Sequence, residues 1–357
     1  MINFSVGPVH LTEEVMEAYG DIPYFRTNEF SDIMLENEKL VKELTNASDN
    51  DRVIFLTGSG TAGMESSVIN TLTLEDKILI INGGSFGTRF AEICSLKKLN
   101  YEEIVVGFEE ILTLEKLEKY SNKNFTALVV NLDETSIGKL YDIELISKFC
   151  KGNNLFLIVD AISAFLADEI DVTKHGIDVL IIGSQKALAC PPGVAIIVLS
   201  ERAIDRIKNI NHDILYFDFK KALKDGERGQ TPFTPAVGIL LQLNARLKQI
   251  SSTGGVEAER KKIEKLANDF RGKVKELPLT IPQYKLSNTV TPLLTNNCSA
   301  KDIFNILKDE YKIWVCPNGG ELGEKLFRVG HIGNLSVEKN NELISALYEL
   351  KERNILK

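Results

Sequence analysis

The feature that most constrains the fold is a repeated alternation of short apolar runs with segments of helical periodicity. The runs are rich in valine, isoleucine and leucine, which is typical of strands buried on both faces. They span residues 53–56, 77–82, 127–131, 155–159, 179–182 and 195–199. Residues 63–72, 86–96 and 143–152 lie between them and have helical periodicity. This alternation predicts an α/β fold, with a mostly parallel sheet covered by helices on both sides.

The character of the sequence changes after Gly229. Residues 236–252 predict a long helix, 253–255 a loop, and 256–276 a second, charged amphipathic helix. The remainder is typical of a small α+β unit that ends in a helix over residues 338–352. We therefore predict a large domain over residues 1–254 and a small C-terminal domain over residues 255–357. Residues 1–15 are a segment that can pack with the small domain.

Composition excludes several classes of protein. The net charge of −8 and the pI near 5.3 argue against a nucleic-acid-binding surface. No apolar run is long enough to cross a bilayer, and residues 1–11 lack the regions of a signal peptide. The five cysteines form no C-x-x-C pair, and the four histidines have no helical ligand spacing. We expect reduced thiols, a cytoplasmic protein, no metal site, and no nucleic-acid or membrane partner.

A glycine-rich segment follows the first predicted strand and opens a predicted helix. Residues 57–63 have the sequence T-G-S-G-T-A-G. Small residues at a helix start let backbone N–H groups approach a phosphate, and the helix dipole favours the anion. The G-x-G-x-x-G spacing of dinucleotide-binding loops is absent, and a tight turn would use the same glycines. The segment is therefore a candidate phosphate cradle, with a plain turn as the alternative.

Two charged residues follow the ends of consecutive predicted strands. Asp160 ends the run over residues 155–159, where an acid is costly unless it is paired. It is suited to face the protonated ring nitrogen of a cofactor, and a helix N-cap or turn is the alternative. Lys186 follows residues 179–182 in a turn of small residues. Partial desolvation would lower its pKa and free the amine for imine chemistry, whereas most lysines are simply solvated.

Seven motifs, one of which contains Asp160 and Lys186, occur in the order typical of one family. They are F-S-V-G-P-V at residues 4–9, R-T-N-E-F at 26–30, N-G-G-S-F-G-T-R at 82–89, E-T-S-I-G at 134–138, V-D-A at 159–161 with S-Q-K at 184–186, T-P-F-T-P at 231–235, and R-V-G-H at 328–331. With the glycine-rich loop, this order resembles fold-type-I pyridoxal-phosphate (PLP) enzymes. It is most similar to the class V aminotransferases, which include alanine–glyoxylate, serine–pyruvate and 2-aminoethylphosphonate–pyruvate transaminases. The resemblance covers nearly the whole chain.

The resemblance implies a role for each matching residue. Lys186 would hold PLP as a Schiff base, and Asp160 would pair with the pyridinium nitrogen. The remaining cofactor-binding residues would be Ser59, Gly60, Thr61, Ser184 and Gln185 at the phosphate, Phe86 on the ring face and Thr135 near the ring hydroxyl. Thr231 and Thr234 would reach the phosphate of a neighbouring subunit, which implies a homodimer with shared sites. Arg328 would hold the substrate carboxylate in a two-pronged contact, with Gly7 also at the substrate.

Each of these residues has a structural alternative. Phe86 is a core residue in the alternative reading, and Thr135 is a helix cap. The threonines of residues 231–235 would shape a turn, and Arg328 would form a surface ion pair of little energetic value. We treat His10 and His331 as structural. The functional roles are favoured because the motifs fall in the family's order.

The substrate is left open by departures from the family pattern. Ile137 stands where a threonine is common, which removes a hydroxyl near the ring. Residues 160–165 resemble the phosphonate transaminases, whereas residues 184–188 and 191–193 resemble the alanine–glyoxylate enzymes. We expect an aminotransferase that moves an amino group between alanine, serine or a 2-aminoethylphosphonate-like donor and a 2-oxo acid such as pyruvate or glyoxylate.

Three other functions fit the sequence less well. A cysteine desulfurase shares the fold but needs a nucleophilic cysteine on a mobile loop, and Cys298 and Cys316 lie in no long glycine-rich loop. A non-catalytic binding protein on a decayed fold is disfavoured by the intact Lys186 and Asp160. An NAD-dependent oxidoreductase would need the dinucleotide spacing and an acid where Asn82 stands.

Overall fold

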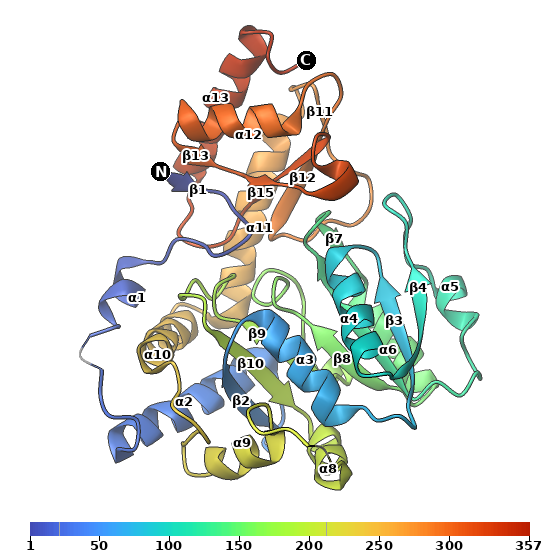
Figure 1. The fold of residues 1–357 in the computed structure, drawn as a ribbon. Helices are drawn as coiled ribbons and strands as arrows, with labels where there is room; N and C mark the ends of the chain where they lie inside the picture. Colours follow the sequence, from blue (N-terminus) through green and yellow to red (C-terminus); the bar gives the residue numbers. More distant parts are fainter. Residues whose placement is uncertain (21, 212) are drawn as a thin grey trace.

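The computed structural model describes residues 1–20, 22–211 and 213–357, and its centre is a seven-stranded sheet (Figure 1). The strands lie in the order β2-β10-β9-β8-β5-β3-β4, and β10 is antiparallel to both its neighbours while the other pairs are parallel. Their bounds are β2 Arg52–Thr57, β3 Lys77–Asn82, β4 Asn100–Val105, β5 Ala127–Asn131, β8 Phe156–Asp160, β9 Val179–Gly183 and β10 Val194–Leu199. The predicted α/β fold with a mostly parallel sheet is confirmed.

Both faces of this sheet are covered by helices. Side chains alternate between faces along a strand, so Ile158 of β8 joins one apolar cluster while Leu157 and Val159 join the other. The first cluster includes residues of α3 Gly60–Thr71, α4 Ser85–Leu96, α8 Glu201–Asn209 and α9 Phe219–Gly226. The second includes residues of α2 Asn28–Thr45, α5 Leu114–Glu118, α6 Ile143–Gly152, α7 Val172–His175 and α10 Val237–Ser252. Two-sided burial explains why the strands are continuous apolar runs.

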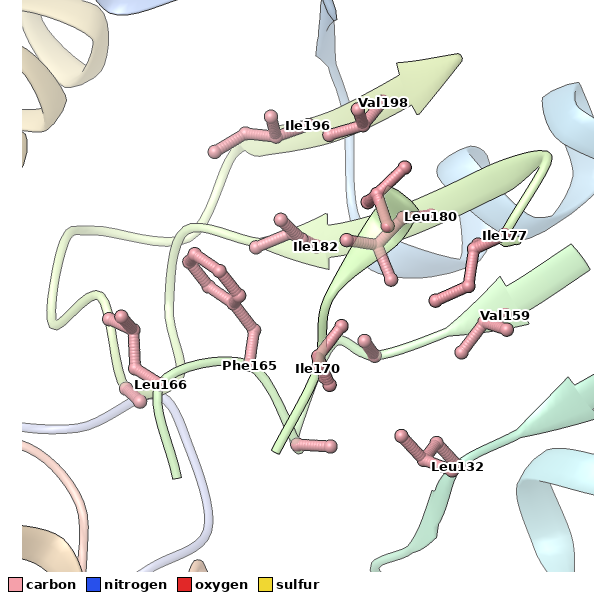
Figure 2. Close-up of a cluster of buried hydrophobic side chains, with 14 of the residues drawn as sticks. Leu132, Val159, Phe165, Leu166, Ile170, Ile177, Leu180, Ile182, Ile196 and Val198 are labelled. Carbon is pink, nitrogen blue, oxygen red and sulfur yellow. The ribbon is translucent and has the colours of Figure 1, made fainter. Parts of the chain in front are cut away.

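Part of the second cluster packs against the segment that follows β8 (Figure 2). Phe165 of that segment points toward Ile182 of β9, and both Phe165 and Leu166 are almost fully buried. The turn after Asp160 is therefore anchored in the core rather than left free on the surface. This anchoring fixes the backbone on which Asp160 itself is carried.

The C-terminal part of the chain forms a second, smaller layer. Its sheet has the order β11-β12-β15-β14, with all three pairs antiparallel. The bounds are β11 Leu279–Thr280, β12 Val290–Thr295, β14 Cys316–Pro317 and β15 Leu326–Gly330, and the helices are α11 Gly255–Val274, α12 Ala300–Asp309, η1 Gly320–Leu322 and α13 Val337–Glu352. A third apolar cluster joins these elements. The division of the chain at residue 254 remains a prediction, which this separate cluster supports.

The N-terminal residues lie against the small layer. β1 Ile2–Asn3 pairs in parallel with β13 Ile313–Trp314, and Phe4 is fully buried in the third cluster (Figure 1). The remaining short elements are α1 Glu13–Glu17, β6 Asp133–Glu134 and β7 Lys139–Leu140. Among the described residues, no helix combines the length and the apolar character needed to span a membrane.

Helix starts follow the capping residues of the sequence. The side chains of Thr27, Asp142, Ser200 and Ser336 each accept a hydrogen bond from a backbone N–H group in the first turn of α2, α6, α8 and α13. Ser59, the N-cap of α3, makes no such side-chain bond. The N–H groups of Gly60 and Thr61 therefore have no side-chain cap, whereas that of Ala62 donates to the Ser59 carbonyl, and this matters for the site below.

Candidate active site

A cavity of about 220 Å³ opens at the carboxyl ends of β2, β5, β8 and β9. In parallel sheets this edge is where ligands bind. The cavity brings together nine of the predicted site residues: Gly7, Ser59, Gly60, Thr61, Phe86, Thr135, Asp160, Gln185 and Lys186. It is also lined by Pro8, Met64, Asn131, Arg89, Ile162, Ser163 and Pro192. Segments from six separate parts of the chain therefore converge on one space.

Lys186 is a buried lysine rather than a solvated one. Its side chain follows β9 and is covered by the N-terminal segment, where its Nζ atom donates to the Val6 carbonyl at 2.5 Å. Gly7 has a φ of +110°, and a Cβ there would lie 2.7 Å from Lys186 Cδ, so glycine is required by both conformation and space. Burial lowers the pKa of the Lys186 ammonium, and the Asp133 carboxylate opposes this shift. A lowered pKa increases the share of free amine, the nucleophilic form.

Asp160 is held by two hydrogen bonds and is 1% exposed. Its Oδ1 atom accepts from the Ile162 N–H group at 2.9 Å, and its Oδ2 atom accepts from Asn131 Nδ2 at 2.8 Å. Desolvation raises the pKa of this carboxyl to about 6, and the two hydrogen bonds oppose the shift. The backbone contact is that of a turn residue, as in the structural alternative, yet no described helix begins at Asp160.

The glycine-rich loop packs closely against the end of the sheet where α3 begins. A Cβ on Gly60 would overlap the Ile162 side chain, and one on Gly63 would lie 2.9 Å from Ile181 Cγ2. These glycines let the N-terminus of α3 approach the end of the sheet. Arg89 of α4 adds a positive charge, because its Nη1 atom donates to Thr61 Oγ1 at 3.3 Å. The uncapped helix start and this guanidinium together suit a bound phosphate.

Phe86 and Thr135 are positioned by the β6 segment. The Glu134 carboxylate accepts from the N–H groups of Phe86 and Gly87, at 3.3 and 3.1 Å, and so fixes the first turn of α4. The Thr135 hydroxyl is within 2.7 Å of Ser163 Oγ and is almost fully buried. Thr135 caps none of the described helices, and Phe86 lines the cavity rather than the core clusters.

Four predicted residues do not line this cavity. Ser184 is buried and donates to the Pro191 carbonyl at 2.7 Å, which shapes the turn after Lys186. Thr231 bonds the Phe233 carbonyl at 2.8 Å, and with Thr234 it lies on a different surface. Their predicted contact with a neighbouring subunit stays a prediction.

Arg328 lies beside the cavity on β15. Its Nη1 atom donates to the Thr135 carbonyl at 2.9 Å, and its Nη2 atom donates to the Pro317 carbonyl at 2.8 Å. The Nε–H group is buried and has no partner among the described residues. Arg328 therefore forms no ion pair with a described residue, contrary to the structural alternative, and retains an unused donor next to Thr135.

Three polar cavity residues received no role from the sequence. Asn131 ends β5 and could have been found by the same rule that selected Asp160, because both are polar residues at the ends of buried strands. Arg89 lies inside a matched motif, but the motif alone does not show which way its side chain points. Ser163 follows a turn whose path only the structure reveals, so the sequence contains no signal for it.

One surface group has the composition of a metal site. Oxygen and nitrogen atoms of Glu144, Glu169 and His175 lie close together outside the cavity. Lys174 forms ion pairs with both carboxylates, so an ammonium group already neutralises them. The two glutamates are exposed and His175 is buried, and the cluster gives no support for a metal ion.

Comparison with known proteins decides the family. The chain matches the model of the family "Aminotransferase class-V" over residues 16–325. The chain belongs to this family. It is therefore an aminotransferase, and the resemblance found in the sequence motifs is confirmed.

Similar proteins cover almost the whole length of this aminotransferase. An uncharacterized aminotransferase of Helicobacter pylori is 31% identical over 97% of the chain and 93% of its own length. The serine–glyoxylate aminotransferase of Hyphomicrobium methylovorum is 28% identical over 99% of the chain and 90% of its own. The crystal structure of alanine–glyoxylate aminotransferase from Nostoc sp. superposes with a TM-score of 0.92 at 24% identity, covering 98% of this chain and 95% of that one. That likeness shows a shared fold.

Proposed function

We propose that this aminotransferase binds PLP in the cavity at Lys186 and Asp160. It would transfer an amino group between a small donor, such as alanine, serine or a 2-aminoethylphosphonate-like amine, and pyruvate or glyoxylate. The observation that carries the proposal is that a buried amine, a buried acid and an uncapped helix start line one cavity. The serine–glyoxylate relative supports the choice of substrates.

The cavity residues fit the cofactor. Asp160 is a fully buried acid whose described partners are both neutral donors, so it suits a cationic ring nitrogen. Asn131 Oδ1 is buried without a partner among the described residues. The α3 start and Arg89 suit the phosphate, with Ser59, Gly60, Thr61 and Gln185 as the lining. PLP, when bound, condenses with primary amines and withdraws electrons from the substrate Cα.

The protein's own groups then have distinct tasks. Lys186 Nζ, whose pKa is lowered by burial, would take the proton from the substrate Cα and later return one. Asp160, ionised, holds the positive charge on the ring nitrogen. Phe86 would cover one face of the ring, and Thr135 would bond near its hydroxyl. The free Nε–H of Arg328 would serve the substrate carboxylate.

The assembly and the compartment are further parts of the proposal. Thr231 and Thr234 lie away from the cavity of their own chain, as expected if they serve a partner's phosphate in a homodimer. The five cysteines are unpaired, and three of them are buried, which is in keeping with a reducing cytoplasm. Size measurement in solution and mixing of two inactive variants with complementary defects, Lys186→Ala and Thr231→Ala, test the shared site. Recovery of activity on mixing is expected.

The experiment for the function combines spectra with a substrate screen. Purified protein is incubated with PLP, and alanine, serine and 2-aminoethylphosphonate are tested against pyruvate and glyoxylate. Lys186→Ala should abolish the absorbance band of lysine-bound cofactor and nearly all turnover, whereas Lys301→Ala on an exposed helix surface should change neither. Full turnover by Lys186→Ala would refute the proposal. Release of sulfide from cysteine would favour the desulfurase alternative instead.

A further inference from the structure

Two buried carboxyl groups lie outside the cavity and have no part in the function proposed above. Asp133 of β6 is 0% exposed and stands two residues before Thr135. Asp168 is 5% exposed and follows the anchored turn after β8. Ser287 and Thr289, from the segment that leads into β12, lie between the two acids and are fully buried. The four side chains join the seven-stranded sheet to the four-stranded sheet.

The four side chains form an unbroken hydrogen-bonded chain. Thr289 Oγ1 lies 2.6 Å from Asp133 Oδ2, Ser287 Oγ lies 2.8 Å from Thr289 Oγ1, and Ser287 Oγ lies 2.5 Å from Asp168 Oδ2. Each of these three oxygen–oxygen contacts requires one proton. The two hydroxyls supply only two protons, because each hydroxyl donates once. The third proton must come from one of the two carboxyl groups.

The partners of each acid indicate where that proton rests. Asp168 Oδ1 accepts from the Asn288 N–H group at 3.1 Å, and the Arg271 guanidinium stabilises its charge. Asp133 Oδ1 is buried and has no partner among the described residues. The negative charge is thus better supported on Asp168, and the proton on Asp133. Burial raises the pKa of Asp133 to about 7, and the neighbouring Asp168 adds to this shift.

We propose that Asp133 and Asp168 share one proton through Thr289 and Ser287, and that this hydrogen-bonded chain links the two sheets in a pH-dependent way. With the proton on Asp133, each member donates to the next until Asp168 accepts. With the proton on Asp168, both hydroxyls reverse direction and Asp133 accepts. Loss of the proton leaves two carboxylates and one oxygen–oxygen contact without hydrogen, which repels.

The surroundings contain four further titratable groups. Lys186 faces Asp133, whereas Arg271 and Lys285 face Asp168. Burial lowers the pKa of Arg271 to about 10, so it remains charged at neutral pH. His331, beyond Arg271, is fully buried with its pKa lowered well below the ordinary value, so it remains neutral. Burial also lowers the pKa of Lys186, which faces Asp133.

The hydrogen-bonded chain matters for the site because the four-stranded sheet carries Arg328. Ser287 and Thr289 lead directly into β12, and β12 pairs with β15, on which Arg328 lies. At the other end, Asp133 is two residues from Thr135, whose carbonyl accepts from Arg328. Deprotonation of the hydrogen-bonded chain therefore weakens the contact between the four-stranded sheet, which carries Arg328, and the segment that places Thr135 at the cavity. This inference rests on the side chains alone and does not depend on the cofactor.

The test is a carbon-13 NMR titration of protein labelled at the aspartate Cγ carbon, with the Asp133 signal assigned by its loss in Asp133→Asn. In the wild-type protein this signal should titrate near pH 7. In Ser287→Ala the chain is cut, so Thr289 is free to donate to Asp133 and the midpoint should fall by at least one pH unit. Two acids that titrate independently predict the opposite, because loss of a nearby hydroxyl donor raises both midpoints.

The controls use another buried serine and a second cut. Ser147, whose hydroxyl donates to the His175 carbonyl at 2.7 Å, is buried elsewhere, and Ser147→Ala should leave the Asp133 midpoint unchanged. Where Ser287→Ala does not fold, Ser287→Gly replaces it, since it also removes the hydroxyl between Thr289 and Asp168 and should also lower the midpoint. An Asp133 signal that titrates below pH 5, or one that these cuts raise or leave unmoved, overturns the proposal.

Discussion

Asn131 and Asp160 occupy paired positions on the adjacent parallel strands β5 and β8, and the amide of Asn131 donates to the Asp160 carboxylate at 2.8 Å. The contact fixes one oxygen of the acid at the floor of the cavity. It also favours the ionised acid, because a hydrogen bond to the charged form lowers the pKa. Asn131 is thus placed to keep Asp160 charged at neutral pH.

Replacement of Asn131 by alanine should weaken cofactor binding. Without the amide, the pKa of Asp160 rises further above its present value of about 6, and the acid becomes partly neutral at pH 7. We expect a roughly tenfold loss of PLP affinity, corresponding to about 1.4 kcal/mol. Titration followed by absorbance should show the loss shrinking at higher pH. Asn340→Ala removes a comparable buried Asn–Asp contact in α13 and should leave the affinity unchanged.

Gly60→Ala should push the N-terminus of α3 away from the sheet. The new Cβ would overlap the terminal methyl of Ile162, so overpacking should cost about 1–3 kcal/mol of unfolding free energy. The site proposed for the phosphate would also become wider, which should weaken cofactor binding. Adding Ile162→Val removes the obstructing methyl and should restore most of both losses, as measured by denaturant unfolding and cofactor titration. Gly272→Ala, in the last turn of α11, adds a Cβ that meets no atom within 4 Å and should not destabilise the protein.

Arg328→Gln should affect substrate binding more than turnover. The variant loses the charged fork, so KM for carboxylate substrates should rise about 10- to 100-fold while kcat changes less. Arg328→Lys should recover little, since an ammonium cannot reproduce the planar arrangement. Arg353→Gln, which removes an exposed ion pair with Glu310, is the matched control and should leave KM as it was. A kcat effect without a KM effect would contradict the proposed carboxylate role.

Stability should fall as pH rises through the range set by Asp133. The folded-state pKa of about 7 is above the ordinary value of 3.8, so the native state binds more protons than the unfolded state between these values. The contribution is therefore present below about pH 4 and is lost progressively up to about pH 7. Asp133→Asn keeps the group neutral, so urea unfolding should show it close to wild type at pH 5 and about 1–3 kcal/mol more stable at pH 8. A gain at pH 5 equal to that at pH 8 would contradict this assignment.

The sequence predicted the central strands because their burial is two-sided. β3 and β5 begin and end where the apolar runs predicted, β9 and β10 differ by one residue at one end, and β2 and β8 differ by one residue at both ends. β4 was missed, because it is an edge strand on which only Ile104 is buried and Glu102 and Glu103 interrupt any apolar run. Edge strands require little apolar surface, so hydrophobic runs are a poor guide to them.

The site was predictable to the extent that it follows strand ends. Asp160 and Lys186 could be placed together because parallel strands end at one edge. Ser184 shares its motif with Lys186, yet its hydroxyl points to Pro191, since a turn rotates successive side chains in directions that the sequence does not specify. The contact between Arg328 and Thr135 spans 193 residues and depends on how the two sheets meet.

The N-terminal segment links the beginning of the chain to its last quarter. Residues 2–3 pair with residues 313–314, the Phe4 carbonyl accepts from the Gly330 N–H group, and the Val6 carbonyl then receives the Lys186 amine. During synthesis residues 2–4 therefore remain unpaired until nearly all of the polypeptide has left the ribosome. The N-terminal segment covers Lys186 last, so a truncated translation product would leave the Lys186 amine exposed to solvent.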